Sequence, residues 1–386
     1  MTYNPEILQD ILRARSLNRT ILSERLGLQR NELDAALSRE PEPKHSLLNK
    51  IARELALPAF VFYMAETPPI VEGIPDFRLP SPAVTQKSRQ TIEAIQLARA
   101  IQRACVENKA RPADRLPELS SQGVEEASLQ IRNFFGITLE DQLGCKNAKE
   151  FYLICRKKIE DRGIFVIHES FPSEDGSGFC LADDRYPVIV VNTQKQTRGR
   201  RLFTLIHELG HVLLHQTGVS DPFSRNNRIE VLCNRFATAF LTPKDYLASL
   251  LGSLDLTDRP DLDEVRRVAA RLRISQQAAV LRLEQLNFYR EGTAERWLRL
   301  IHNLGNPDFS EKGGGNGEPP PQEKVKLAKY GFHFARAFGE LLESGRLSDV
   351  DLYRISGLKP KYRRLYFDFA NSLTGDELTG VELDDE

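Results

Sequence analysis

The feature that most constrains this chain is the run His-Glu-Leu-Gly-His at residues 207–211. Two histidines at positions i and i+4 lie on one face of a helix, where both can reach a single metal ion. The apolar residues around this run recur at helical spacing: Phe203, Ile206, Leu209 and Leu213. We therefore expect a packed amphipathic helix from about Arg198 to Gln216, with Gly218 as the residue that follows its C-terminus.

The residue types in this run are those of a catalytic zinc site. Catalytic zinc takes three protein ligands and keeps a fourth position open. His207 and His211 would supply two ligands, and the carboxylate of Glu208 would lie beside the open position. A zinc-bound water has a pKa of about 7, so a neighbouring carboxylate can take its proton. The run therefore predicts a Zn²⁺ site with Glu208 as general base. The interleaved apolar residues disfavour the alternative, two solvated histidines on a surface helix.

The third ligand is expected on the next helix, which starts near Arg228 and stops before Pro243. Glu230 lies at the margin of the apolar face of this helix, where an unpaired charge would be costly. Two histidines and one glutamate form an established catalytic set, so Glu230 is the predicted third ligand. The alternative is a solvated glutamate near a helix N-terminus. Asn234, one turn further on, is the candidate to orient Glu230 or the substrate backbone.

Other polar residues near the run have simpler interpretations. His215 follows His211 by one more turn and is a rival ligand, but three ligands from consecutive turns would strain the site, which favours a place at the rim. His168 ends a predicted strand and is interpreted as an edge histidine. Asp183 and Asp184 are interpreted as turn residues.

Composition narrows the class of protein. The 386 residues include 53 Lys or Arg and 54 Asp or Glu, a balance unlike that of a strongly basic nucleic-acid-binding chain. The longest apolar runs are too short to span a bilayer, and residues 1–10 lack the pattern of a secretory signal. The five cysteines include no CxxC pair, which favours reduced, packed thiols over a thiolate metal cage. These observations predict a cytoplasmic protein without a membrane partner.

The N-terminal region is predicted to be helical, because its apolar residues recur at helical spacing. Gly27-Leu28 separates two of its helices, which is the shape of a helix-turn-helix, and we assign this module to residues 1–66. The prolines that follow keep the chain extended, so residues 67–82 are interpreted as a connection between domains. A long helix is expected over residues 83–108.

The middle of the chain combines strands with helices, which predicts an α+β fold. Strands are expected just before the motif helix, over residues 164–167, 179–182 and 188–191. Helices are expected over residues 262–272 and 275–286. The central domain is assigned to residues 83–290. A flexible Gly- and Pro-rich linker is expected within residues 291–323, and a helical C-terminal module over residues 324–386.

With these motifs the chain resembles the ImmA/IrrE family of metallopeptidases. The matching stretches are residues 74–78, 186–192, 201–211, 234–237 and 240–243. Their order and spacing are similar to the family over about residues 70–290. The resemblance implies a zincin-like core with a small sheet next to the HExxH helix.

The resemblance also implies roles and partners. It implies that His207, His211 and Glu230 hold zinc and that Glu208 is the base. Many members carry an N-terminal helix-turn-helix similar to Cro/C1-type repressors, and the family often cleaves a partner repressor of that type. The implied substrate is therefore a repressor whose cleavage derepresses stress, prophage or mobile-element genes.

The charge of the N-terminal module leaves open whether the module contacts DNA or protein. The presumed recognition helix begins with Gln29, Arg30 and Asn31, but two acidic residues follow within it. Residues 1–65 hold nine Lys or Arg and eight Asp or Glu, whereas DNA binding normally depends on neutralising phosphates. A module that contacts protein is equally consistent with this charge. The alternative functions are therefore a regulator whose metal site is secondary, and a toxin–antitoxin-like pair that holds its repressor.

Overall fold

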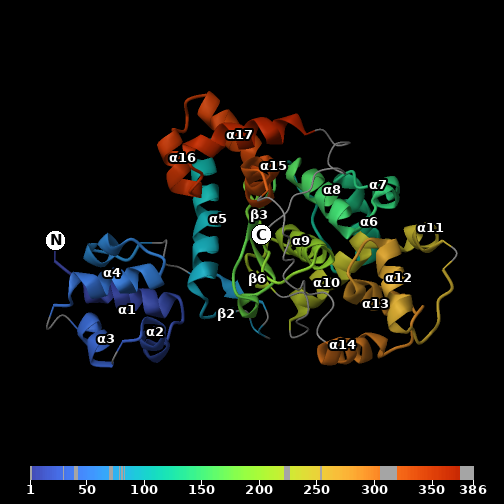
Figure 1. Cartoon of the computed structure of the whole chain (residues 1–386), viewed down its shortest axis with the longest axis horizontal. Helices are drawn as coiled ribbons and strands as arrows, with labels where there is room; N and C mark the ends of the chain where they lie inside the picture. Colours follow the sequence, from blue (N-terminus) through green and yellow to red (C-terminus); the bar gives the residue numbers. More distant parts are fainter. Residues whose placement is uncertain are drawn as a thin grey trace.

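The fold is taken from a computed structural model of the chain. It describes residues 2–28, 30–38, 42–68, 73–77, 79, 81, 83–220, 227–252, 254–304 and 320–373. The N-terminal helices lie at one end, the sheet lies in the middle, and the helices of residues 247–285 lie at the other end (Figure 1). The architecture is α+β, as expected.

The N-terminal helices form a module with its own hydrophobic core. They are α1 (Pro5–Ala14), α2 (Arg19–Leu26), α3 (Arg30–Leu37) and α4 (His45–Glu54), followed by the short helix η1 (Ala59–Tyr63). Gly27 ends α2 in the left-handed region, with φ of 60°. The helical content is confirmed, and the helix-turn-helix assignment stays a prediction. Gln29 and the side chains of Arg30 and Asn31 lie outside the described residues.

One six-stranded mixed sheet forms the centre, in the order β2-β1-β6-β4-β5-β3. Its strands are β1 (Pro75–Asp76), β2 (Ala83–Val84), β3 (Phe165–Glu169), β4 (Gly178–Leu181), β5 (Val188–Asn192) and β6 (Gly218–Ser220). β4 runs antiparallel to both β5 and β6, while β3 is parallel to β5 and β1 is parallel to β6. β3, β4 and β5 confirm the three expected strands, and the other three strands were not expected.

The middle strands are apolar on both faces because helices cover both faces. Every residue of β5 is buried, and β5 contacts both α5 (Arg89–Glu107) and the motif helix α9 (Arg198–Leu213). Figure 1 shows the sheet between these two helices. This placement holds α9 directly against β4 and β5.

Two sequence boundaries are corrected by the sheet. The helix expected from residue 83 begins only at Arg89, because Ala83 and Val84 form β2 and pair with β1. The motif helix ends at Leu213 and not at Gln216, because His215 turns the chain with φ of 55°. Gly218 is therefore not a capping residue; it begins β6.

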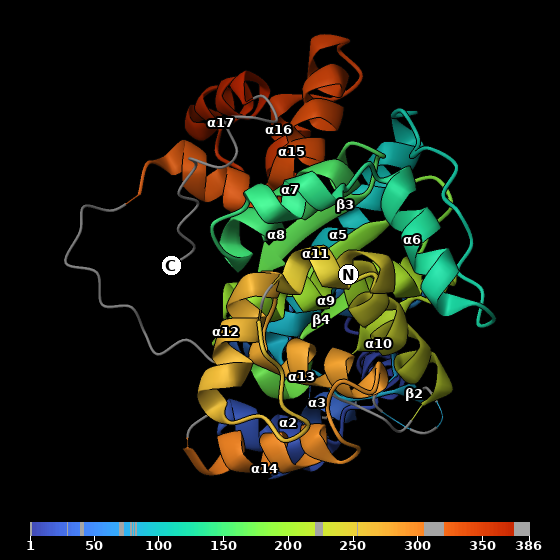
Figure 2. The same cartoon turned by 90° about the vertical axis from the view of Figure 1, so that its right-hand side faces the viewer.

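The remaining helices of the central region lie mostly on the α9 side of the sheet, which faces the viewer in Figure 2. Those between α5 and the motif helix α9 are α6 (Val124–Phe134), α7 (Leu139–Gly144) and α8 (Ala148–Glu160). Those after the motif are α10 (Arg228–Leu241), α11 (Leu247–Leu251), α12 (Leu262–Leu272), α13 (Gln276–Gln285) and α14 (Thr293–Leu304). The helices α12 and α13 confirm the two that were expected there.

The C-terminal helices are α15 (Gln322–Glu343), α16 (Asp349–Ser356) and α17 (Pro360–Ser372). α15 packs on β3, and the three helices share one continuous hydrophobic core with the sheet. They therefore extend the central domain and do not form a core of their own. Most of the expected Gly- and Pro-rich linker lies outside the described residues, as does the acidic end of the chain. None of the helices described here is long and apolar enough to cross a membrane.

Candidate metal centre

Helix α9 carries the motif and is buried along almost its whole length. The side chain of Thr197 caps its N-terminus by accepting a hydrogen bond from the amide of Arg200. His207, Glu208 and His211 have no exposed surface. The motif helix is thus a core helix, as the interleaved apolar residues predicted.

Helices α9 and α10 pack closely at Gly210, and this packing places α10 beside the motif. A β carbon at Gly210 would lie 3.0 Å from Cδ1 of Phe236 and 3.2 Å from Sγ of Cys233, both on α10. A larger residue at position 210 would require these side chains to shift by a few tenths of an ångström. Asn227 starts α10 by accepting a hydrogen bond from the amide of Ile229, so that Glu230 falls in the first turn.

Three potential ligands from the two helices converge in the interior. Nε2 of His207 lies 3.1 Å from Nε2 of His211. Oε2 of Glu230 lies 3.3 Å from Nε2 of His207, and Oε1 of Glu230 lies 3.3 Å from Nε2 of His211. All three side chains are fully buried, and among the described residues they form the group suited to a metal ion.

The spacing of these atoms fits zinc. Zinc bonds to nitrogen and oxygen are about 2.0–2.1 Å long, so two ligands of a tetrahedral ion lie about 3.3 Å apart. The three separations in the structure, 3.1, 3.3 and 3.3 Å, are close to that edge length. Two imidazoles and one carboxylate supply the donor set of a catalytic zinc site and leave a fourth position for water or substrate.

Electrostatics within the cluster favour the ionised form of Glu230. Burial raises the pKa of this carboxyl, but His207 and His211 more than offset this effect and hold the pKa at about 2. Glu230 is therefore a carboxylate at neutral pH, the form in which it can bind a cation.

Glu208 lies beside the cluster and faces the sheet. Its Oε1 accepts a hydrogen bond from the hydroxyl of Ser220, in β6. A β carbon at Gly178, in β4, would lie 3.0 Å from the same oxygen. The carboxylate thus occupies space that a glycine leaves open in the sheet, and a serine fixes its orientation. Sequence reasoning did not identify either residue, because each is an ordinary strand residue until the sheet is assembled.

Asn234 lies one turn beyond Glu230, as expected. Its carbonyl Oδ1 is buried and has no hydrogen-bond partner among the described residues. Its role in orienting Glu230 stays a prediction.

The remaining candidates lie away from the cluster. His215 is largely exposed, and its Nδ1 pairs with Asp184 at 2.9 Å. Asp183 accepts hydrogen bonds from the amides of Arg185 and Tyr186, as a turn residue does. His168 is buried on β3 and bonds to the hydroxyl of Tyr152.

Two buried cysteines lie near the carboxylates of the site. Burial, together with the nearby Glu208 and Glu230, raises the pKa values of Cys180 and Cys233 well above their usual range. Both thiols therefore stay protonated at neutral pH in the metal-free protein, which suits buried packing residues.

Fold and geometry together define the class of site: two buried histidines and one buried glutamate that could hold a metal ion, on paired helices beside a mixed sheet. The sequence comparison names the family. Residues 159–284 match the family model Peptidase_M78, described as the IrrE N-terminal-like domain. This match supports the predicted resemblance to the ImmA/IrrE family over the central part of the chain. None of the curated proteins matches the chain. The match includes every candidate ligand and Glu208, and it begins well after β1 and β2.

Proposed function

We propose that this protein is a zinc-dependent endopeptidase that cleaves a partner transcriptional repressor of the Cro/C1 type. The observation that carries the proposal is the convergence of His207, His211 and Glu230 at the spacing of a tetrahedral ion, inside a domain of a metallopeptidase family. Cleavage of the repressor would derepress stress, prophage or mobile-element genes.

In this proposal His207, His211 and Glu230 hold the metal. Zinc, when bound there, supplies a Lewis acid that polarises the scissile carbonyl and makes water more acidic. Glu208 takes a proton from the attacking water and then delivers it to the leaving amine. The hydrogen bond from Ser220 fixes one oxygen of Glu208, so the carboxylate is oriented before the substrate arrives.

Glu208→Gln separates catalysis from metal binding, since it removes the base but none of the three ligands. The assay uses the full chain with Zn²⁺ and, as substrate, a purified Cro/C1-type repressor, taken from the neighbouring gene where that gene encodes one. We expect wild-type protein to cleave this repressor and Glu208→Gln to be slower by at least about 100-fold with its zinc content unchanged. Cleavage by Glu208→Gln at the wild-type rate would refute the proposed role of this residue.

Binding measurements on the same proteins distinguish the proposed peptidase from the two alternative functions, in which the protein binds a partner without cleaving it. A wild-type chain that loads Zn²⁺ and binds the repressor tightly without cutting it would favour the toxin–antitoxin-like alternative. Gel-shift binding to DNA by Glu208→Gln and wild type alike would favour a regulator whose metal site is secondary.

A further inference from the structure

A segment from outside the family match lies against the metal centre. The strand β1 pairs with β6, and the amide of Phe77 donates a hydrogen bond to the carbonyl of Val219 at 2.8 Å. The ring of Phe77 stacks on the imidazole of His211, with ring centroids 4.8 Å apart and planes inclined by 20°. Only 2% of Phe77 is exposed, so the contact is part of the interior.

This contact replaces the support that a metal-binding histidine usually has. Such a histidine normally donates its second ring nitrogen to a carboxylate or carbonyl, which fixes the plane of the ring. Nδ1 of His211 is buried and has no hydrogen-bond partner in the described part of the chain. Stacking on Phe77 restricts the same ring rotation by packing.

The Phe77 ring occupies space that Gly218, in β6, leaves open. A β carbon at Gly218 would collide with Cε2 of Phe77 and would lie 2.7 Å from the carbonyl oxygen of Pro75. β6 therefore requires glycine at the point where the aromatic ring crosses it.

A buried ion pair holds β1 in position. Nζ of Lys87 lies 2.5 Å from the carboxylate of Asp76, and the hydroxyl of Thr85 donates to the same oxygen at 2.7 Å. Both charged side chains are almost fully buried. Loss of one partner would leave an uncompensated buried charge, so the pair strongly restrains the residue next to Phe77.

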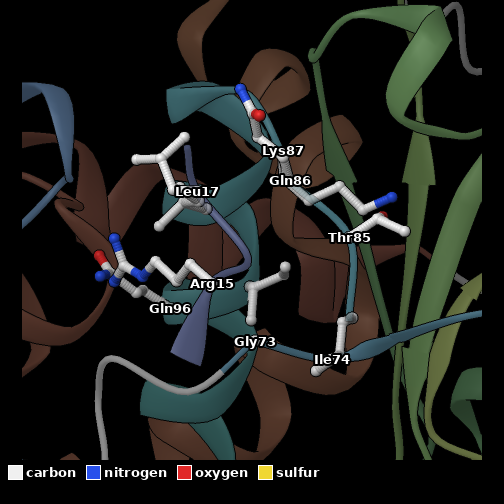
Figure 3. Close-up of a pocket in the computed structure, with 10 residues that line it drawn as sticks. Arg15, Leu17, Gly73, Ile74, Thr85, Gln86, Lys87 and Gln96 are labelled. Carbon is white, nitrogen blue, oxygen red and sulfur yellow. The ribbon is translucent and has the colours of Figure 1, made fainter. Parts of the chain in front are cut away.

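Residues 73–74 and 85–87 lie next to the N-terminal helices. Nη1 of Arg25 donates to the carbonyl of Lys87 at 3.1 Å. Figure 3 shows the joint, where Arg15 and Leu17 face residues 73–74 and 85–87 across a small cavity. The cavity of about 20 Å³ has room for roughly one water, so this joint is closely packed and is not a ligand site.

We propose that residues 73–77 and 83–88 form a positioning strap, in which Phe77 orients the ring of His211 for metal binding. The inference rests on the proposed function in one respect, since it takes His211 as a metal ligand. Phe77 is a positioning residue, because it contacts the ligand and not the metal. The strap also ties the metal centre to the N-terminal helices.

The test measures Zn²⁺ affinity by competition with a chromogenic chelator, and the visible spectrum of the Co²⁺-substituted full chain. Removing support from around a metal ligand lowers metal affinity by about 10–100-fold. We expect Phe77→Leu to lower Zn²⁺ affinity about 10-fold and to change the Co²⁺ spectrum. Phe77→Tyr keeps the stacking face and should restore both. The matched control is Phe334→Leu, which removes an equally buried ring that stacks on Phe338 in α15, and it should leave both unchanged.

Gly218→Ala provides a second route to the same result, because it displaces the Phe77 ring without removing it. It should lower Zn²⁺ affinity as Phe77→Leu does. If both variants bind Zn²⁺ with wild-type affinity, the strap proposal is wrong, whereas the assignment of the metal site still holds. Faster repressor cleavage by Phe77→Leu at unchanged affinity would also overturn it, since the strap would then be a lid. A wild-type chain that binds no Zn²⁺ would refute the proposed function, and the strap proposal with it.

Discussion

Gly210→Ala should destabilise the protein, although alanine is the better helix former. At an unhindered position inside a helix this replacement stabilises by about 1 kcal/mol. At Gly210 the new β carbon would lie 3.0 Å from Phe236 and 3.2 Å from Cys233, closer than ordinary contact. Overpacking of this kind costs about 1–3 kcal/mol, so the net effect is a loss of about 1 kcal/mol. The strain also pushes α10 away from α9 and separates Glu230 from the two histidines.

The assay is urea unfolding of the metal-free protein, followed by Zn²⁺ competition. Gly339→Ala in α15 is the matched control, because its β carbon would lie 3.8 Å from Phe367, an ordinary contact distance. That variant should gain about 0.5–1 kcal/mol and keep its Zn²⁺ affinity. A Gly210→Ala protein as stable as Gly339→Ala would refute the argument that close helix approach assembles the site.

Further predictions concern pH and the neighbours of the site. Burial raises the pKa of Glu160 to about 7, above its ordinary 4.5. The folded protein then binds this proton more tightly than the unfolded chain does, so the free energy of unfolding should fall as pH rises from about 4.5 to 7. Glu160→Gln should reduce this fall in stability, measured as the difference in Tm between pH 5 and pH 7. The same difference in Tm for the variant and the wild type would contradict the raised pKa of Glu160. His215→Ala should keep wild-type Zn²⁺ affinity in chelator competition, because His215 pairs with Asp184 at the surface; a clear loss would make it a ligand. Cys233→Ala should likewise retain zinc, since the protonated thiol is not a ligand, and zinc loss on metal analysis would show otherwise.

The local part of the site could be predicted from sequence. The spacing of His207 and His211 and the helical pattern around them depend only on residues within a few turns. Glu230 could be proposed because a carboxylate on an otherwise apolar helix needs a partner. The structure brings these three side chains together, although they come from two separate helices.

The long-range part could not be predicted in the same way. β1 and β2 each have two residues, too few for an alternating pattern. β1 lies inside the proline-rich stretch that was interpreted as a connection, and β2 directly follows it. Gly218 was expected to end a helix, because the sequence does not show that Phe77 packs against it. The stack of Phe77 on His211 depends on sheet pairing between distant segments, which no local pattern encodes.

The zinc content of purified protein, with Zn²⁺ supplied and excess removed, tests the central claim most directly. We predict one zinc ion per chain in the wild type and in Glu208→Gln. His211→Ala and Glu230→Ala should each lose it while remaining folded, as judged by circular dichroism. A wild-type chain without zinc, or full zinc retention after loss of both His211 and Glu230, would contradict the assignment of the metal centre.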